Sequence, residues 1–381
     1  MANLSRMAAI VGVDESDEIG KVPNKSRLQL GSEAAFNALD DAGLSLSDVD
    51  GLFVAGPSPY NMAEYIGITP KYTDGTNVGG SSFVIYVEHA LAAISAGLID
   101  VALIVHGEAG RSSRAYAGDD PNMPIAQYEH PYGLVIEPHP YALACNRYMH
   151  EFGQERTQNA LGEIAVSTRK WAQLNPKSFI KDDMSMKDYH ESRWISWPFH
   201  LFDCCLVTDG GGATVITSAA VAKNTKKKPV WVLGTAEGHD HGEGILQQTD
   251  LCSTIARETG PRALEMAGLS HSDIDLAMIY DSFTYTVLIT LESLGFCGRG
   301  EGPDFVANQR TAPGGEFPMN TNGGGLSYCH TGMYGMFLLL EAARQLRGEC
   351  GDRQVKDAKT CLVNGTGGTL SSTGTIVLAA D

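Results

Sequence analysis

The order of apolar and polar positions along the chain predicts buried strands separated by helices. Short apolar runs at 101–105 and 276–280 are bounded by polar or turn-forming residues, as expected of strands that are covered on both faces. Longer apolar stretches at 83–96 and 335–347 follow glycine-rich turns and have the length of helices. Alternation of helices with apolar strands favours an α/β fold in which parallel-rich mixed sheets lie between layers of helices.

One segment of the chain occurs twice. Residues 38–50 recur as residues 263–275, with nine of thirteen positions identical at a constant offset of 225. Each copy is typical of a helix end with a glycine cap, Gly43 or Gly268, followed by a Ser/Asp turn and a strand. The alternative is that two common helix-ending sequences match by chance. Nine identities in thirteen positions favour a duplication.

The duplication divides the chain into two predicted halves, residues 1–220 and residues 229–381. A charged run with a proline at 223–229 marks the crossover between them. The first half carries a long insertion at about 107–200, and such excursions from a rigid scaffold often line binding sites. Its large side chains indicate either a wall for a bulky apolar ligand or ordinary core packing. These side chains are Tyr128, Tyr132, Tyr141, Met149, Trp194 and Trp197.

Composition limits the class of protein. The 381 residues include 28 Lys and Arg against 45 Asp and Glu, which gives a formal charge of −17. This balance argues against nucleic acid or an anionic membrane surface as a partner, because both reward clustered basic residues. The most apolar stretch, 91–105, is interrupted by Asp100, so no membrane span is predicted. The N-terminus does not have the pattern of a secretion signal, and we expect a cytoplasmic protein.

The cysteine and histidine positions do not predict a metal site. Eight cysteines are present, none of them in a C-x-x-C pair, so a zinc ribbon within this chain is not expected. In a chain of this size without a secretion signal, reduced and mostly buried thiols are favoured over disulfides. His239 and His241 flank Asp240, but no third ligand follows at a recognisable spacing, so an exposed loop is the better interpretation.

Candidate chemistry gathers at three glycine-rich turns, residues 78–82, 322–332 and 364–368. A glycine turn that opens a helix leaves N–H groups facing a ligand, although most such turns only reverse the chain. The second turn carries His330, a residue type that transfers protons near neutral pH. Tyr280 ends the duplicated strand of the second half, at the strand end where open parallel sheets bind ligands. It is either a site residue or a packed aromatic.

Six short motifs are characteristic as a set. They are Tyr280-Asp281-Ser282-Phe283, residues 291–297 (LESLGFC), residues 320–330 (NTNGGGLSYCH), residues 364–368 (NGTGG), Ser192-Arg193-Trp194 and residues 201–205 (LFDCC). With these motifs the chain resembles the thiolase superfamily over essentially its whole length. Within the superfamily it is similar to the lipid-transfer-protein-type branch, which includes acyl-CoA aldolases of steroid side-chain breakdown. The resemblance implies two similar halves in a layered αβαβα core and a tight homodimer.

The resemblance also implies roles for individual residues. His330 matches the catalytic histidine of the family's Gly-His-Pro turn, although its neighbours in that turn differ here. Tyr280 stands where thiolases place the Asn or His that holds a catalytic water. Asn364 stands where degradative thiolases keep a second, proton-shuttling cysteine. Thiolases carry their nucleophilic cysteine at the start of the helix after the first glycine turn. Here that position is Gly80 or Ser81, so the usual nucleophile is missing.

The missing nucleophile distinguishes between two reactions. A thiolase holds an acyl group on a thiolate, and a Ser hydroxyl without an adjacent base is a far poorer nucleophile. Retro-aldol cleavage of a 3-hydroxyacyl-CoA has no covalent step. It needs a base for the hydroxyl proton, an oxyanion hole for the thioester enolate and an acid that reprotonates it. We therefore predict a carbon–carbon lyase acting on a bulky acyl-CoA.

Two other functions remain open at this point. One is a thiolase that cleaves a 3-ketoacyl-CoA with an unconventional nucleophile, such as Cys329 or free CoA attacking the ketone directly. The other is a non-catalytic acyl-CoA or lipid carrier that kept the fold and lost the chemistry. Product analysis with and without free CoA separates the lyase from the thiolase, and binding without turnover indicates the carrier.

The predicted site combines residues from both halves. The predicted catalytic residues are Tyr280, His330, Cys329 and Tyr328, and the predicted thioester-binding residues are Gly80, Ser81, Asn364, Gly365 and Gly367. No metal and no tightly bound cofactor are expected, and coenzyme A enters as part of the substrate or as a cosubstrate. Its phosphates normally require Lys or Arg. The candidates are Arg111, Arg114, Arg193, Arg299 and Arg310. The resemblance also implies a separate small partner protein, a zinc ribbon joined to an OB-fold.

Overall fold

The computed structural model describes residues 4–113 and 120–380. Within them, nine strands form one hydrogen-bonded sheet in the order β3-β2-β4-β7-β1-β8-β11-β10-β9. These strands are β1 (Ala8–Glu15), β2 (Gly51–Val54), β3 (Tyr72–Asp74), β4 (Val101–Ala109), β7 (Asp209–Ser218), β8 (Val230–His239), β9 (Leu276–Ile279), β10 (Thr360–Gly367) and β11 (Ser372–Ala379). The helices are α1 (Arg27–Ala42), α2 (Pro59–Ile66), α3 (Ser82–Ser95), α4 (Pro124–Tyr128), α5 (Pro138–Phe152), α6 (Gln154–Gln173), α7 (Met186–Glu191), α8 (Ala219–Ala222), α9 (Ala256–Ala267), α10 (Thr284–Leu294), α11 (Gly302–Val306) and α12 (Gly335–Arg347).

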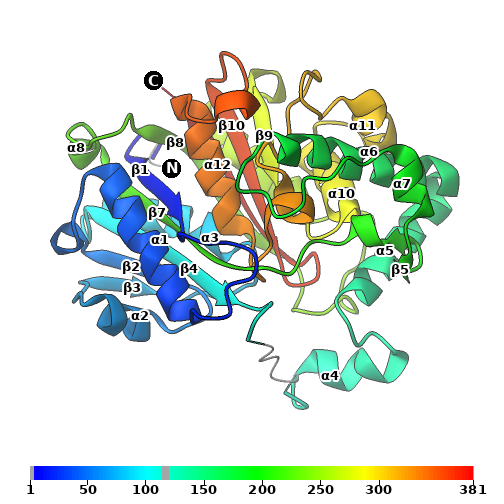
Figure 1. Ribbon diagram of the computed structural model, residues 1–381, viewed down its shortest axis with the longest axis horizontal. Helices are drawn as coiled ribbons and strands as arrows, with labels where there is room; N and C mark the ends of the chain where they lie inside the picture. The colour runs from blue at the N-terminus through cyan, green and yellow to red at the C-terminus, as the bar shows by residue number, and fades with distance from the viewer. Residues whose placement is uncertain (1–3, 114–119, 381) are drawn as a thin grey trace.

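The sheet consists of two parts that meet at β1 and β8. Two residue pairs join these strands, Ala9 with Trp231 and Ile10 with Val230. Helices α3 and α12 pack against strands of both parts and therefore form a layer between them. Helix α1 covers β1, β4 and β7 from outside (Figure 1). Helix α9 packs against β8 and β11. The layered αβαβα core implied by the family resemblance is confirmed.

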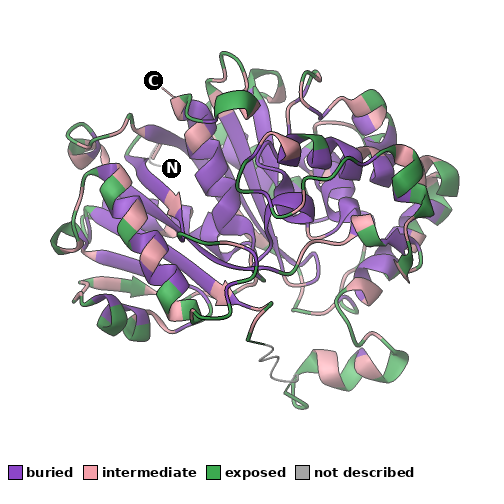
Figure 2. Ribbon diagram, in the orientation of Figure 1, coloured by how far each residue is buried: buried purple, intermediate pink, exposed green. Residues whose placement is uncertain are grey.

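The central helix α3 shows why the sequence folds in layers. Its residues are apolar almost all round, and ten of the fourteen are buried. A helix without a polar face is stable only when it is covered on all sides, which is the environment between two sheet parts. Figure 2 shows the same pattern for the whole molecule, with burial concentrated in the strands and the central helices and exposure on the outer helices.

The expected predominance of parallel pairing is wrong. Of the eight strand pairs in the described nine-stranded sheet, three are parallel, β2–β3, β2–β4 and β9–β10, and five are antiparallel. Strands β4 and β9 are buried along almost their whole length, so both are largely apolar although their neighbours run in different directions. An uninterrupted apolar run therefore predicts a buried strand and does not predict the direction of its neighbours.

The two copies of the repeated segment fold alike. Gly43 ends α1 and Gly268 ends α9, with φ of 70° and 68° in the left-handed region, where glycine pays no steric penalty. A short 3₁₀ turn with a Ser/Asp capping box follows each glycine and leads into β2 or β9. This agreement supports the duplication, while the limits at 1–220 and 229–381 stay a prediction.

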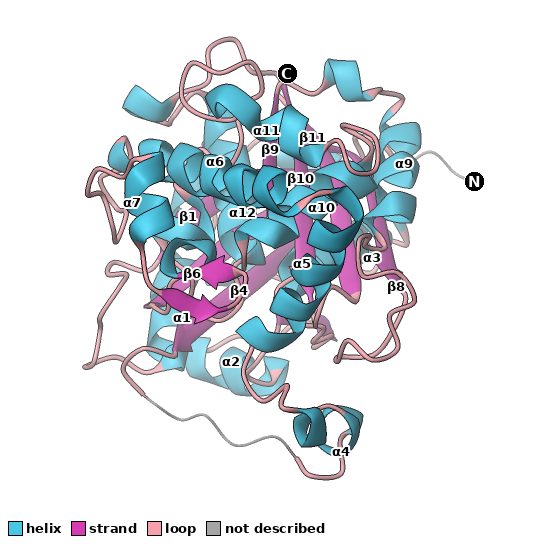
Figure 3. Cartoon of the chain, turned by 90° about the vertical axis from the view of Figure 1, so that its right-hand side faces the viewer, coloured by secondary structure: helices cyan, strands magenta, loops and turns pink. Residues whose placement is uncertain are grey.

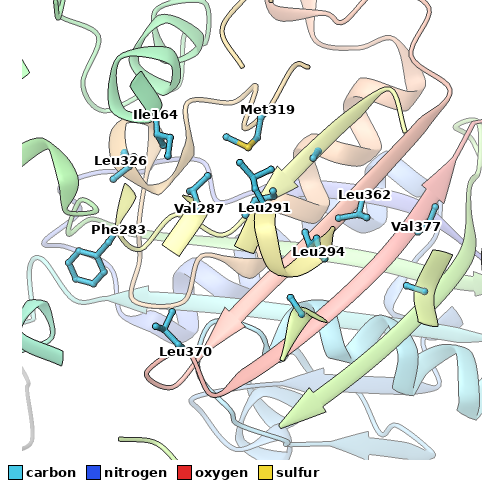
Figure 4. Packing of buried hydrophobic residues seen from close by; sticks show 14 of the residues in the cluster. Ile164, Phe283, Val287, Leu291, Leu294, Met319, Leu326, Leu362, Leu370 and Val377 are labelled. Carbon is cyan, nitrogen blue, oxygen red and sulfur yellow. The ribbon is translucent and has the colours of Figure 1, made fainter. Parts of the chain in front are cut away.

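The insertion lies between β4 and β7. It contains α4 to α7 and a two-stranded ribbon of β5 (Trp194–Ser196) and β6 (Phe199–His200) (Figure 3). Helix α6 packs against α10, α11 and η6 (Gly324–Tyr328), a π-helical turn. Ile164 of α6 and Leu326 of that turn join the buried cluster that contains Val287 of α10 (Figure 4). The insertion therefore covers the end of β9, where Tyr280 follows.

Two further expectations concern the chain as a whole. All eight cysteines are free thiols, and five of them are buried, as expected of a reduced protein. Across residues 4–113 and 120–380, none of the helices combines the length and the apolar character that a transmembrane span requires.

Candidate active site

Tyr280 and His330 form a hydrogen-bonded pair in the interior of the protein. The backbone N–H of Tyr280 donates to the carbonyl oxygen of Asn364 on β10, at 3.0 Å. The Tyr280 hydroxyl lies 3.1 Å from Nε2 of His330 and accepts the backbone N–H of Tyr334, at 3.0 Å. Because the hydroxyl oxygen already accepts this N–H, its own proton is free to be donated to the imidazole.

Burial keeps both members of the pair uncharged. The exposed fraction is 4% for Tyr280 and 8% for His330. Burial raises the pKa of Tyr280 well above its usual value and lowers the pKa of His330 to about 4, because a buried charge loses its hydration. Near neutral pH the imidazole is therefore an unprotonated base and the phenol a proton donor. A proton from a third group can reach the imidazole through the phenol oxygen.

The turn that carries His330 is held by the strand region before β7. The His330 backbone N–H donates to the Thr208 hydroxyl at 3.0 Å, and the Thr208 N–H donates to the His330 carbonyl oxygen at 2.9 Å. The next residue, Thr331, has its hydroxyl 2.6 Å from Nε2 of His106 on β4. Both contacts reach across the sheet from the other half of the chain, so the position of His330 depends on both halves.

The side-chain space of residue 80 is occupied by Tyr280. A Cβ atom placed on Gly80 would overlap the ring carbons and the hydroxyl oxygen of Tyr280, well inside the 3.0 Å that real Cβ contacts keep. Glycine is therefore required at position 80 as long as Tyr280 holds this position. The family's nucleophilic cysteine was expected at Gly80 or Ser81, and at Gly80 a tyrosine from the other half fills the space that its side chain would need.

The first and third glycine-rich turns meet, and the start of α12 approaches the first turn. A Cβ on Gly367 would overlap the carbonyl of Val78, and a Cβ on Gly79 would lie 2.9 Å from the backbone nitrogen of Gly368. A Cβ on Gly335, at the start of α12, would overlap the carbonyl of Gly80. The backbones of the two halves approach one another here more closely than any side chain allows.

The predicted thioester-binding residues lie at this junction. Gly365 sits with its Cα beside Ser81, whose Cα would be 3.1 Å from an added Cβ. The Ser81 hydroxyl is bonded to the Ser372 hydroxyl at 2.8 Å, so it is engaged in joining the turn to β11. The side-chain nitrogen of Asn364 donates to Thr375 at 2.8 Å, and its side-chain oxygen is buried without a hydrogen-bond partner. The start of α3 at this point supplies the positive end of a helix dipole.

The structure separates Tyr328 from the Tyr280–His330 pair, although the sequence grouped them. The Tyr328 hydroxyl donates to the Glu15 carboxylate at 2.6 Å. Glu15 also accepts from Arg344 at 2.6 Å and from Lys177 at 2.7 Å. Because the backbone is extended at Cys329, directly after η6, successive side chains point to different surroundings. Tyr328 therefore belongs to a buried ionic network that joins β1 to α12.

Cys329 is also not brought into the pair's hydrogen bonds. Its side chain is fully buried in the core between the two sheet parts. Burial raises the pKa of its thiol well above the usual value, and the charge of Glu15 raises it further. A thiol that stays protonated is a weak nucleophile, so its surroundings do not suit the alternative role considered for Cys329.

Other site residues were not predicted from the sequence. Tyr334 and His106 carry no local pattern, and only the fold places them beside Tyr280 and Thr331. His106 is buried, its pKa is lowered to about 3 by burial, and its Nδ1 has no partner. Tyr141 was noted as a large side chain of the insertion. Its hydroxyl donates to the carbonyl of Gly368 at 2.9 Å, so the insertion reaches the third glycine turn.

The remaining insertion residues and the basic candidates lie elsewhere. Met149 is buried in the core, whereas Tyr128, Tyr132, Trp194 and Trp197 are exposed. Arg299 is paired with Asp250 and Glu151, and Arg310 lies over the Phe305 ring. Arg111 donates to the carbonyl of Val207, and Arg114 lies outside the described residues. Within residues 4–113 and 120–380 no group of three or more His, Cys, Asp or Glu could hold a metal ion.

Comparison with known proteins places the chain in a family. It is 35% identical to the steroid side-chain-cleaving aldolase of Thermomonospora curvata, over 100% of both chains. It is also 35% identical to the 17-hydroxy-3-oxo-4-pregnene-20-carboxyl-CoA lyase of Mycobacterium tuberculosis, over 91% of this chain and 92% of that one. Residues 236–380 match the family model described as thiolase C-terminal domain-like. The chain belongs to the thiolase superfamily.

Solved structures agree with this assignment. The structure of the Ltp2-ChsH2(DUF35) aldolase has a TM-score of 0.91 with this thiolase-superfamily protein at 33% identity, and the match covers 99% of each chain. The predicted recognition of the lipid-transfer-protein-type branch is confirmed by these relatives, which are named as lyases or aldolases. This protein is accordingly a thiolase-superfamily enzyme.

Proposed function

We propose that this protein cleaves a carbon–carbon bond of a bulky 3-hydroxyacyl-CoA by a retro-aldol reaction without a covalent acyl-enzyme. The observation that carries the proposal is the overlap between Tyr280 and the side-chain space of Gly80. The overlap excludes a nucleophilic side chain at position 80 and puts a proton-transferring phenol there, while the Ser81 hydroxyl is bonded to Ser372. The relatives named as a steroid side-chain-cleaving aldolase and an acyl-CoA lyase support the same reaction class.

The reaction balances with the groups in the pair. The Tyr280 oxygen takes the proton of the substrate's 3-hydroxyl while the Tyr280 proton passes to Nε2 of His330, 3.1 Å away. The O–H electron pair becomes the new carbonyl bond, the C2–C3 bond breaks, and its electrons form a thioester enolate. The enolate then takes up a proton at C2, which His330 can return through Tyr280. The products are a ketone or aldehyde and a shortened acyl-CoA.

Passing the proton through the phenol has an electrostatic reason. Burial raises the pKa of Tyr280 well above its usual value, so a free tyrosinate is not available at neutral pH. His330, whose pKa is lowered to about 4, is unprotonated and can accept the phenol's proton as the phenol accepts the substrate's. The Tyr334 N–H, 3.0 Å from the Tyr280 oxygen, stabilises the negative charge that develops there.

The thioester enolate needs N–H donors. We propose that the backbone of Gly80 and Ser81, at the start of α3, and that of Gly365 and Gly367 supply them. This proposal is supported by the close approach of the two glycine turns and by the positive helix end at Ser81. The unpartnered oxygen of Asn364 is suited to a donor on the substrate.

The structure gives less support to the two alternatives. A thiolase working through Cys329 would need a thiolate, and the surroundings of this thiol raise its pKa. A pure carrier would have no need of the buried tyrosine–histidine pair, whose polar groups cost free energy to bury. Direct attack by free CoA on a 3-ketoacyl-CoA is separated from the retro-aldol reaction by the products.

We also propose the assembly in which the enzyme works. A small zinc-ribbon and OB-fold protein is the proposed partner, and it is supported by the relative solved as an Ltp2-ChsH2(DUF35) aldolase. A homodimer is proposed from the family resemblance. Coenzyme A is proposed as part of the substrate and not as a resident cofactor, in a cytoplasmic setting.

The decisive experiment is cleavage of a defined substrate. The probe is 17-hydroxy-3-oxo-4-pregnene-20-carboxyl-CoA, the compound in the mycobacterial relative's name, with the chain expressed alone and with a DUF35 partner. The wild type is expected to release a ketone and a shortened acyl-CoA without added CoA. Tyr280→Phe and His330→Ala are each expected to lose at least about 100-fold in kcat, the scale of a lost general acid or base.

A matched control separates chemistry from folding. Tyr285 is a fully buried tyrosine whose hydroxyl donates to the carbonyl of Leu251 at 2.8 Å, away from the pair. Tyr285→Phe is expected to retain turnover, and all variants should unfold cooperatively. Full activity in Tyr280→Phe and His330→Ala, or products that appear only with free CoA, would contradict the proposal.

A further inference from the structure

Asp281 places a fully buried carboxylate beside the turn that carries His330. It follows Tyr280 directly and has no exposed surface. Its Oδ1 accepts the backbone N–H of Gly325 at 2.7 Å, and its Oδ2 accepts the N–H of Leu326 at 3.3 Å. These are among the first N–H groups of η6, so the carboxylate caps this short turn.

The backbone of the 324–330 turn packs tightly against the Asp281 carboxylate. A Cβ on Gly324 would overlap Oδ2 of Asp281, so the turn can approach the carboxylate only because this residue is glycine. A Cβ on Gly325 would lie 3.1 Å from Oδ1 of Asp281 and 3.1 Å from Cδ2 of His330. The carboxylate and the imidazole therefore flank the same glycine.

The ionisation of Asp281 is balanced between burial and hydrogen bonding. Burial raises its pKa to about 7, against the lowering effect of the Gly325 and Leu326 N–H groups. The ionisable groups that face it are Tyr280 beside it, Cys205 from the segment before β7, Cys329 and His330 from the turn, and Tyr334 before α12. Its charge raises the pKa of Tyr280 and Tyr334, and so helps to keep both phenols protonated.

We propose that Asp281 is a positioning residue, whose ionised carboxylate fixes the 324–330 turn so that His330 can accept a proton from Tyr280. The inference rests on the proposed function, because it concerns the same proton transfer. When Asp281 is protonated, one oxygen becomes a hydroxyl and is a poorer acceptor for the turn's N–H groups. The turn then loosens, and the distance between the Tyr280 oxygen and Nε2 of His330 is no longer held.

The test is the pH dependence of kcat. In the wild type, kcat is expected to fall about tenfold per pH unit below a midpoint near 7, because activity follows the ionised form of Asp281. Asp281→Asn keeps the size of the side chain but removes the charge and one acceptor. It is expected to lower kcat at pH 8 by about 10-fold to 100-fold, to leave KM nearly unchanged, and to abolish the acid limb near pH 7.

The chain offers a matched control in Asp203. This carboxylate is also fully buried, and its pKa is also raised to about 7. Its donors are the Thr284 hydroxyl at 2.5 Å, the Tyr189 hydroxyl at 2.8 Å and the backbone of His200 at 2.7 Å. None of these donors belongs to η6. Asp203→Asn is expected to keep the acid limb of the wild type. An acid limb that persists in Asp281→Asn with an unchanged midpoint would overturn the proposal.

A second measurement does not depend on turnover. In ¹⁵N-histidine NMR spectra of the wild type, assigned with His330→Gln, the imidazole signal of His330 is expected to shift with a midpoint near pH 7. It should not do so in Asp281→Asn. A flat wild-type signal between pH 6 and pH 8 would contradict the positioning role even if the lyase reaction is confirmed. If the wild type fails to cleave the substrate, the NMR titration still decides whether Asp281 controls the turn.

Discussion

The side chain of Tyr280 occupies the space that a Cβ atom on Gly80 would need. Such a Cβ would overlap the Tyr280 ring and its hydroxyl oxygen, although the two residues belong to different halves of the chain. A side chain at position 80 and a tyrosine in this position at the end of β9 are therefore exclusive alternatives. The presence of Tyr280 in this space therefore both excludes a side chain at position 80 and supplies a group that can transfer a proton.

This overlap predicts that mutations at Gly80 and Tyr280 have non-additive effects on the free energy of unfolding. Gly80→Ala is expected to destabilise the protein by about 1–3 kcal/mol through overpacking and to lower kcat about 100-fold, because a displacement of about 1 Å at the reacting group is costly. Combining it with Tyr280→Ala is expected to restore most of the stability but not the lyase activity. Urea unfolding of the two single variants and the double variant measures the coupling.

The control for this cycle is Gly242→Ala. Nothing lies within 4 Å of a Cβ at Gly242, and its backbone is not in the left-handed region, so the free energy of unfolding should change by less than about 0.5 kcal/mol. Additive free energies in the Gly80 and Tyr280 cycle would show that the two side chains do not share the space.

The parts of the fold that the sequence predicts are those that have local signals. The glycine caps of α1 and α9, the apolar strands β4 and β9 and the length of α12 follow from spacing and composition. Strand direction does not, because burial on both faces removes the alternation that would report it. The close approach of the first and third glycine turns has no local signal, because it depends on how the two halves pack against each other.

The residues of the candidate site likewise divide into those that have a local sequence signal and those that do not. His330 and Tyr280 could be predicted from the sequence because His330 lies in a glycine turn and Tyr280 ends a repeated strand. Asp281 was visible only as part of a motif, since its role depends on the N–H groups of Gly325 and Leu326. Tyr328 lies in the same turn as His330, but its hydroxyl donates to Glu15, and this long-range contact has no signal in the local sequence.

The buried imidazoles predict sensitivity to acid. His330 has its pKa lowered to about 4, so the folded protein keeps it neutral while the unfolded chain binds a proton below about pH 6.5. The stability that neutral His330 contributes to the folded state is therefore fully present above about pH 6.5 and is lost as the pH falls toward about 4. At one pKa unit per 1.36 kcal/mol, the loss approaches about 3 kcal/mol.

Urea unfolding at pH 7 and pH 4.5 tests this expectation. The buried carboxyls Asp281 and Asp203, whose pKa values are raised, act in the opposite direction, so the quantity to compare is the pH-dependent difference between wild type and His330→Gln. The variant should lose less stability on acidification than the wild type. His190→Gln, at an exposed position, is the control. Equal losses in wild type and His330→Gln would show that His330 is not held neutral.

The network around Glu15 predicts a structural role for Tyr328. Tyr328→Phe removes one hydrogen bond to a carboxylate that keeps Arg344 and Lys177, so it is expected to cost about 1–3 kcal/mol and to change kcat less than about threefold. Arg344→Met removes the partly buried cation that is paired with the buried Glu15 carboxylate, and it is expected to cost more, about 3–5 kcal/mol. Urea unfolding and steady-state turnover measure both effects. A large fall in kcat for Tyr328→Phe without loss of stability would show that Tyr328 takes part in the reaction.

Cys329 gives the sharpest distinction between the lyase and a thiolase. Its thiol is fully buried and its pKa is raised by burial and by Glu15, so it should not form a thiolate during turnover. Cys329→Ala removes the sulfur, leaves a small cavity and is expected to cost about 1–2 kcal/mol in stability while retaining lyase turnover. Intact-protein mass spectrometry of the wild type during turnover should show no acyl adduct. An adduct that disappears in Cys329→Ala, together with loss of activity, would identify this thiol as the nucleophile and contradict the non-covalent mechanism.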